Sequence, residues 1–321
     1  MFAFLENKSE KPFFSVRRNM VICAIIYTFL WGCGFPLVKI CMESFNIASE
    51  DQASKCLVAG IRFTLSGILT LLALPLITGG EGKLCPTKKE LLYSGGYGIV
   101  ATTLQYAFTY VGLSMIDGSK GAVYDQLGVF IIVLCGGLFF KDERLGIKKI
   151  LGCVLGFIGV LMISLDADGF SFSLSGEGIM LCAVFCQTTS YFIAKASSGS
   201  VLAPKLTGYG QLIGGVILTS LSLIMGGRIL TVNITAILTL LALTLISALA
   251  YTLSLMPLKY FPVSEVSSFN LLITVFGVVM SAALLGENIF KLNYALSLSL
   301  ISLGIFFINK KDKTSREFSF S

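Results

Sequence analysis

Long apolar runs separated by short polar links fill almost the whole chain. Windows of about 20 mainly apolar residues, the length that crosses a bilayer as a helix, occur ten times. Backbone polar groups cannot stay unpaired in lipid, so each run is predicted to be a helix. The predicted spans are 20–41, 54–78, 91–114, 119–140, 149–166, 177–195, 206–226, 234–257, 263–285 and 292–309. The pattern predicts an all-α, polytopic membrane protein with ten transmembrane helices.

Basic residues favour alternate links, which predicts an orientation. With the N-terminus inside, 18 of the 24 Lys and Arg residues lie in inner links and tails, five lie outside, and Arg62 lies within a span. Because Lys and Arg concentrate on the cytoplasmic side of membrane proteins, the tails 1–19 and 310–321 are both predicted to be cytoplasmic. We therefore expect a multi-pass protein of the cell membrane.

Composition removes several classes of function. Hydrophobic residues make up 55% of the chain and charged residues 13%, against about 25% charged residues in soluble proteins. This excludes a soluble enzyme and a nucleic-acid partner. Histidine is absent, and the nine cysteines form no CxxC pair. No catalytic residue, metal site or cofactor is predicted, and Cys41 and Cys56 are expected to be free thiols.

The chain repeats itself weakly. A shift of 156 lays residues 22–39 over 178–195, and a shift of 144 lays 141–143 over 285–287. Two repeats follow, 20–168 and 174–309. Five helices per repeat is an odd number, so the second copy must be inverted, an arrangement typical of secondary transporters with a site at the repeat interface.

Several short motifs resemble one family. They are Trp31-Gly32-x-Gly34-Phe35-Pro36-x-x-Lys39 in the first span, Ala59-x-x-Arg62-Phe63 in the second, and the acidic ends of the fourth and ninth spans, Lys141-Asp142-Glu143 and Leu285-Gly286-Glu287. Together they resemble the drug/metabolite transporter superfamily, EamA type. The resemblance implies a ten-helix inverted repeat around a central cavity that moves small metabolites, often outward.

One feature of that family is missing. Its members often have proline midway along the fourth and ninth helices, where this chain has Gly128 and Thr274. Glycine can still loosen a helix, whereas threonine should not, so the sequence leaves open whether the ninth helix has a hinge.

Two ionisable residues lie within spans at similar depth, Arg62 and Asp125. Such groups usually face a cavity or a partner, and their opposite charges predict a pair. The pair either fixes helix packing or serves transport, with Asp125 taking a proton or Arg62 facing an anionic group of the solute. Lys39 and Lys195, near helix ends, either extend to the lipid headgroups or take part in gating.

Polar and aromatic side chains deep in the spans are candidates for the cavity lining, because such groups fix and surround a bound small molecule. With Arg62 and Asp125, the predicted substrate-binding residues are Trp31, Gln105, Tyr106, Tyr110, Tyr124, Gln187, Tyr191 and Asn270. Tyr97, Gln126, Gln211, Tyr251 and Ser268 belong to the same polar group. Tyr27 and Tyr93 lie near helix ends and are predicted to mark the membrane interface.

These observations favour a secondary, non-ATP transporter of small metabolites such as amino acids, working by alternating access, with export suggested by the resemblance. A sugar-phosphate or nucleotide-sugar exchanger ranks lower because few cations lie deep. An integral membrane enzyme acting on lipid and a channel are further alternatives. The expected partners are a small-molecule solute and membrane lipid, and a coupling proton stays open. The pairs Gly152-x-x-x-Gly156 and Gly210-x-x-x-Gly214 are expected to pack helices within one chain, giving a monomer or a weak dimer.

Overall fold

The computed structural model describes residues 12–78, 84–113, 115, 118–141, 143, 145–164, 174–285 and 292–310. All regular elements in these ranges are helical. The α-helices are α1 (Arg17–Ser44), α2 (Gln52–Ile77), α3 (Lys88–Gly98), α4 (Gln105–Leu113), α5 (Gly118–Phe139), α6 (Ile147–Ser164), α7 (Ile179–Ser197), α8 (Ala203–Ile224), α9 (Ile234–Leu255), α10 (Val263–Ser268), α11 (Leu271–Leu285) and α12 (Leu292–Asn309). Short 3₁₀ or π segments are Phe13–Ser15, Ile99–Leu104, Leu174–Gly178 and Met256–Lys259.

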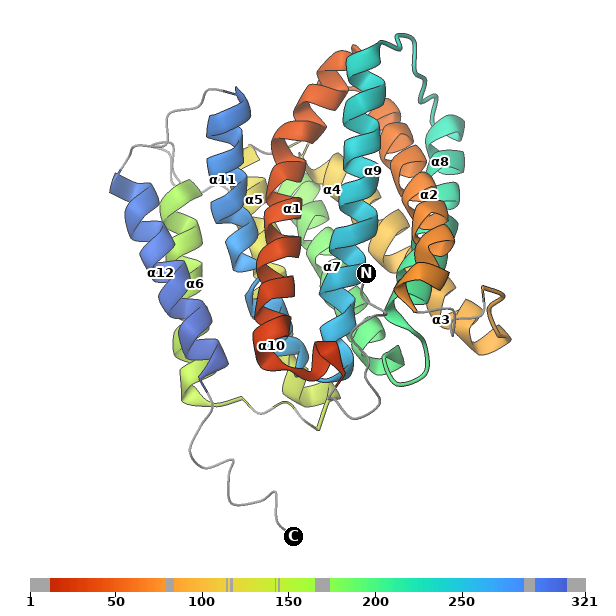
Figure 1. Ribbon diagram of the computed structural model, residues 1–321. Helices are drawn as coiled ribbons and strands as arrows, with labels where there is room; N and C mark the ends of the chain where they lie inside the picture. Colours follow the sequence, from red (N-terminus) through yellow and green to blue (C-terminus); the bar gives the residue numbers. More distant parts are fainter. Residues whose placement is uncertain are drawn as a thin grey trace.

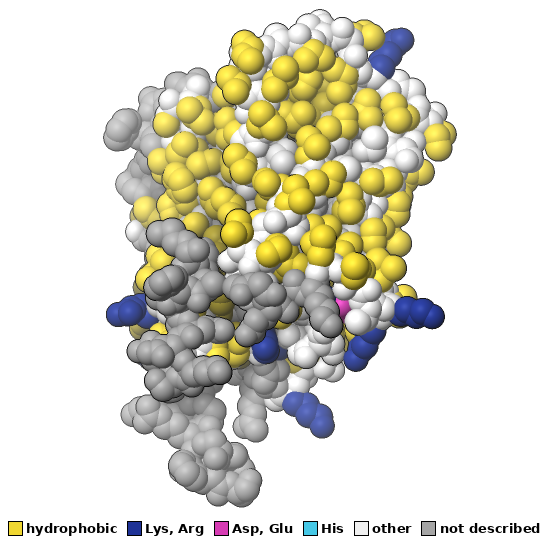
Figure 2. Space-filling view, turned by 45° about the vertical axis from the view of Figure 1, so that its right-hand side comes forward, with side chains coloured by type: hydrophobic (Ala, Val, Ile, Leu, Met, Phe, Trp, Pro, Cys, Tyr) yellow, Lys and Arg dark blue, Asp and Glu magenta, His cyan; other side chains and the backbone are white. Residues whose placement is uncertain are grey.

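Within the described residues, each apolar run falls on one helix or on consecutive helical segments, such as α3, a π segment and α4 in the third run. Six helical runs in the described residues are long and apolar enough to cross a membrane, and Tyr124–Phe139 and Leu296–Asn309 are shorter apolar stretches. Hydrophobic side chains cover the middle of the face in Figure 2, and most of the Lys and Arg side chains visible there lie near its lower margin. Such a surface suits lipid around the middle of the protein and water at its ends.

The helices run up and down between two ends of a bundle (Figure 1). The lower end in that view holds the start of α1, the end of α12, and the connections α5–α6, α7–α8 and α9–α10. The upper end holds the connections α1–α2 and α8–α9. These two names are used below for the ends of the bundle.

Glycines bring several helix pairs into backbone contact. Helix α2 packs along α8, and α6 packs along α12. A Cβ on Gly67 would lie 2.5 Å from the backbone nitrogen of Leu212, and one on Gly152 would lie 2.7 Å from the carbonyl oxygen of Gly304. A Cβ on Gly214 would collide with the carbonyl oxygen of Gly98, in α3. The expected packing of small residues within one chain is therefore confirmed.

The ninth apolar run is not one straight helix, and this corrects the sequence expectation. Helix α10 ends at Ser268 and α11 begins at Leu271. At this break Asn270 N–H donates to the carbonyl of Ser267, and Ile273 N–H donates to the carbonyl of Asn270, both at 2.9 Å. These tight i→i+3 bonds replace the α-helical ladder. The break lies before Thr274, which sits inside α11, while α5 runs unbroken through Gly128.

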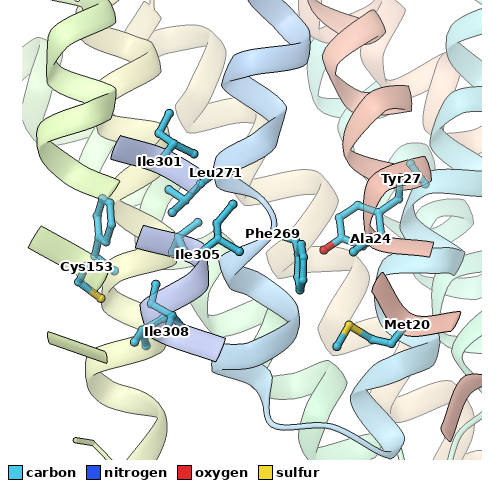
Figure 3. Close-up of a cluster of buried hydrophobic side chains, with 13 residues drawn as sticks. Met20, Ala24, Tyr27, Cys153, Phe269, Leu271, Ile301, Ile305 and Ile308 are labelled. Atoms are coloured by element: carbon cyan, nitrogen blue, oxygen red, sulfur yellow. The ribbon is translucent and has the colours of Figure 1, made fainter. Parts of the chain in front are cut away.

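A core of apolar side chains closes the lower part of the bundle between α1, α5, α6, α11 and α12 (Figure 3). Tyr27 belongs to this core, is 0% exposed, and donates its hydroxyl to the carbonyl of Val266 at 3.0 Å. Its predicted place at the membrane interface is therefore wrong. A tyrosine near the end of a span can face inward when another helix offers its hydroxyl an acceptor.

Candidate functional site: a central cavity

A cavity of about 410 Å³ lies between helices of both halves of the chain. Nine of the ten predicted substrate-binding residues line it: Trp31, Arg62, Gln105, Tyr106, Tyr110, Asp125, Gln187, Tyr191 and Asn270. A cavity of this size that mixes aromatic walls with a few polar groups is typical of small-molecule sites. Its α1 lining, from Trp31 to Val38, places it toward the upper end.

Arg62 enters the cavity from the middle of α2. This helix is capped by Asp51, whose carboxylate accepts the backbone N–H of Ser54 at 2.9 Å. The Arg62 side chain is almost buried, and its Nε donates to Ser247 Oγ of α9 at 2.7 Å. Its guanidinium carbon lies 5.0 Å from the centre of the Phe63 ring. Within the described residues its terminal nitrogens make no hydrogen bond, so they can bind a carboxylate in the cavity.

Asp125 lines the cavity from α5. Gln187 Nε2 donates to Asp125 Oδ1 over a long 3.4 Å. Gly128 leaves the space that Gln187 occupies, because a Cβ on this residue would collide with the amide oxygen. Helix α7 thus supplies Asp125 with a neutral partner.

The predicted pairing of Arg62 with Asp125 is wrong. In the described part of the chain no ion pair joins them, and each has one neutral partner on a helix of the second half. Depth along a span does not determine which neighbour a side chain meets, since the neighbour depends on how the helices are placed around the cavity. The cavity therefore contains one cation and one anion that do not neutralise each other.

Aromatic rings form one wall of the cavity. Trp31 and Tyr251 meet edge to face with ring centres 5.2 Å apart. The hydroxyls of Tyr106 and Tyr251 are hydrogen-bonded at 2.9 Å. Phe63 lies behind this wall, with its ring centre 4.5 Å from that of Tyr106. Such rings accept an apolar side chain, and their faces also attract cations.

Two residues of the cavity lining have a buried side-chain oxygen with no hydrogen-bond partner among the described residues. Asn270 Nδ2 donates to the hydroxyl of Tyr191 at 2.9 Å, but Asn270 Oδ1 accepts no hydrogen bond, and neither does Gln126 Oε1. Both side chains are more than nine-tenths buried and line the cavity. An unmade buried hydrogen bond costs about 1–3 kcal/mol, so these two oxygens are costly where they lie.

A packed layer of residues closes the cavity below. Tyr97, Tyr191, Leu255, Val263 and Val266 belong to this layer, which joins α3, α7, α9 and α10. We call it the closing layer. Tyr97, Tyr191 and Leu255 of this layer also line the cavity, and the layer continues to Val263 and Val266 of α10.

Tyr124 is not a lining residue, contrary to the prediction. It is 7% exposed and packs against Met180 and Val184 of α7. Gln211 also lies elsewhere, where it accepts the Ser66 hydroxyl at 2.6 Å between α2 and α8. Ser268, at the end of α10, accepts a hydrogen bond from Asn309. Helical spacing alone did not distinguish the cavity from polar contacts between helices.

The two lysines proposed for gating differ from each other. Lys39 is exposed and does not line the cavity. Lys195 Nζ donates to the carbonyls of Leu258 and Phe261, at 3.0 and 2.8 Å. It therefore bonds to the turn between α9 and α10, and it is not among the residues that line the cavity. A cation near the last carbonyls of a helix is a favourable arrangement.

The candidate list omitted several small polar residues in the lining. Thr109, Ser190 and Ser254 all face the cavity. Ser190 lies three residues after Gln187, and Ser254 lies three residues after Tyr251, so helical spacing from these polar and aromatic residues was the available signal. Serine and threonine are common throughout apolar helices, where they can bond to their own backbone, and so neither stood out.

The described residues contain no group of three Cys, Asp or Glu side chains that could hold a metal ion. All nine cysteines are free thiols, as expected for Cys41 and Cys56. The side chains that line the cavity carry charges, amides, hydroxyls and aromatic rings.

The model of the EamA-like transporter family matches the chain twice, over residues 18–165 and 174–310. The chain belongs to the EamA-like transporter family. It is a multi-pass membrane protein of the transporter type, and the predicted family resemblance is confirmed.

Several relatives of this EamA-like chain carry transporter names. It is 26% identical over 279 residues to a "Probable amino-acid metabolite efflux pump" of Salmonella typhimurium, covering 83% of this chain and 87% of that protein. An "Uncharacterized transporter" of Haemophilus influenzae is 25% identical over 216 residues, 64% of this chain and 67% of its own. A crystal structure that is 16% identical superposes with a TM-score of 0.74 over 91% of this chain and 96% of that one, which supports the fold alone.

Proposed function

We propose that this protein is a secondary carrier of zwitterionic small metabolites such as amino acids, with ten spans arranged as two inverted halves that alternate access to the central cavity. The observation that carries the proposal is the cavity's unpaired charges. Among the described residues the terminal guanidinium nitrogens of Arg62 make no hydrogen bond, and the carboxylate of Asp125 accepts one long one. An α-amino acid presents the complementary carboxylate and ammonium on one small frame.

Reciprocal helix contacts support the inverted halves. Helix α1, the first of the first half, packs on α9 and α11 of the second half. Helix α7, the first of the second half after its π segment, packs on α4 and α5 of the first half. Two copies related by an axis in the membrane plane would make such exchanged contacts. Similar energies for the two opposite tilts then allow alternating access.

The remaining surroundings fit the same solute. The unpartnered acceptors Asn270 Oδ1 and Gln126 Oε1 suit the N–H groups of an ammonium. The aromatic wall of Trp31, Tyr106 and Tyr251 suits an apolar side chain. One similar protein is named as an amino-acid metabolite efflux pump, which favours export across the cell membrane with both tails cytoplasmic.

Counterflow in proteoliposomes tests the proposal. Proteoliposomes that contain the purified protein are loaded with unlabelled solute. Uptake of the same solute in labelled form is then compared for amino acids, sugar phosphates and nucleosides, with and without a pH gradient. We expect uptake of one or more amino acids, and a response to the pH gradient would identify a coupling proton. Saturable exchange of a sugar phosphate in place of every amino acid would contradict the proposed solute class.

The second candidate is an anionic-solute exchanger. Arg62 favours it as a buried cation in the cavity. Asp125 in the same cavity opposes it, because a carboxylate repels a phosphate group. Replacing Asp125 with Asn should therefore improve sugar-phosphate exchange if this candidate is correct.

A further inference from the structure

One carboxylate at the lower end of the bundle is buried although it lies outside the cavity. Glu143, in the connection between α5 and α6, is 5% exposed. Its Oε1 accepts the backbone N–H of Ser264 at 2.8 Å, and its Oε2 accepts the Ser264 hydroxyl. Lys149 Nζ lies 2.9 Å from Oε2 and also donates to Ser264 Oγ at 2.7 Å. The three residues form a closed polar cluster.

This cluster ties the two halves of the chain together. Glu143 and Lys149 belong to the first half, whereas Ser264 is the second residue of α10 in the second half. A buried ion pair that also satisfies a backbone donor and a hydroxyl is strong only while all its partners stay in place. Gly136, at the end of α5, leaves room for the carboxylate, since a Cβ there would lie 3.4 Å from Glu143 Cδ. The cluster thus depends on the position of α10.

Helix α10 lies between the cluster and the cavity. Its residues Val263 and Val266 are fully buried members of the closing layer. At its other end the chain breaks at residues 269–270, where Asn270 reaches the cavity and binds Tyr191. A short helix bounded by such a break can move as a unit, because the break interrupts the α-helical ladder.

Other contacts of α10 are individually weaker. Arg17 Nε lies 3.0 Å from Glu265 Oε1, but the Arg17 side chain is 44% exposed, and exposed ion pairs contribute little. Tyr27 donates one neutral hydrogen bond to the carbonyl of Val266. The Glu143 cluster, by contrast, combines burial, charge and a backbone donor of α10.

We infer that Glu143 is the latch of the lower end. It is a positioning residue that holds α10 against the closing layer, and its release lets α10 move about residues 269–270 and opens the cavity downward. The inference rests on the proposed alternating-access function and adds to it the contact that separates its two states. A solute that binds Asn270 would act on the same short helix from the cavity side.

Cysteine accessibility tests the latch without any solute. Val266→Cys is placed in a chain whose native cysteines are replaced, and its reaction with a charged, membrane-impermeant thiol reagent is timed in proteoliposomes. Glu143→Gln keeps the size of the side chain but removes its charge. We expect it to accelerate labelling about tenfold, because a hydrogen-bonded buried charge pair is lost.

Glu90→Gln is the matched control. Glu90 Oε1 also lies 2.9 Å from a lysine, Lys205, and this ion pair is also at the lower end, but it joins α3 to α8 and does not touch α10. It should leave the labelling rate unchanged. Equal acceleration by both variants would show general loosening and overturn the latch, and so would an unchanged rate in Glu143→Gln.

Ser264→Ala is a second test of the same contact, and it can replace Glu143→Gln if that variant does not fold. It preserves the ion pair of Glu143 with Lys149 and removes one hydroxyl, so a smaller acceleration is expected and none would contradict the latch. Labelling that responds as expected in a protein that transports nothing would contradict the proposed function alone. Transport with unresponsive labelling would contradict the latch alone.

Discussion

Replacing Asp125 with Asn separates the charge of this residue from its shape. Asparagine keeps the size and still offers an oxygen to Gln187, which donates to Asp125 Oδ1 in the structure. The variant therefore removes one negative charge from the cavity and leaves Arg62 and its Ser247 partner in place. If Asp125 binds the ammonium of the solute, the variant should lose apparent affinity for solutes that carry an ammonium and keep it for solutes that lack one.

The magnitude follows from the surroundings of Asp125. Two unit charges about 4 Å apart attract each other by about 4 kcal/mol at an effective dielectric constant of about 20. Part of this attraction offsets the removal of water from the ammonium, and truncating one partner of a buried charge pair typically costs about 2–5 kcal/mol. Taking about 2 kcal/mol as the lower bound, the KM for an amino acid should rise at least about 30-fold.

The assay compares two solutes in the same proteoliposomes. One is a transported amino acid, and the other is the carboxylic acid that lacks only its amino group. Wild type should favour the amino acid, and Asp125→Asn should lose most of that preference while its KM for the carboxylic acid changes little. An equal rise in KM for both solutes, or no change for either, would refute the assignment of Asp125 to the ammonium.

Three further changes have definite expected outcomes. Arg62→Gln should raise the KM for an amino acid more than for the amine that lacks its carboxylate, measured by the same counterflow assay, because the guanidinium is assigned to the carboxylate. Gly214→Ala should lower the thermal unfolding temperature in detergent, since its Cβ would meet the backbone of Gly98 and such overpacking costs about 1–3 kcal/mol; Gly96→Ala, with open space around its Cβ, is the control. Asp51→Ala should lower stability at neutral pH by about 1 kcal/mol, the usual worth of a helix N-cap. The hydrogen bonds from Ser54 hold the pKa of Asp51 below its ordinary value, so this stabilisation is present above that ordinary value and is lost as the pH falls through the lowered one; a stability difference between variant and wild type that stays constant down to acid pH would contradict it.

The helices were predictable because each apolar run is long enough to cross a membrane, and a chain in lipid must satisfy its own backbone hydrogen bonds, as a helix does. Within the described residues the predicted ranges fall on helical segments, with a break in the ninth run, and six helical runs are long and apolar enough to cross a membrane. Most of the cavity lining was predictable for a related reason. Amides and charges deep in an apolar run are costly in lipid, so Gln105, Gln187 and Asn270 had to face the interior.

The sequence by itself determined which segments are helical, which family the chain belongs to and which polar residues avoid lipid, because these depend on residue type and local spacing. Only the tertiary structure decided which groups meet. It separates Arg62 from Asp125, excludes Tyr124 from the cavity, breaks the ninth run at residues 269–270, and joins Glu143 to Ser264 across 121 residues of chain. The physical reason is that burial in a membrane protein is set along each helix by composition, whereas the contact partner is set by the rotation and packing of its neighbours, which no single segment encodes.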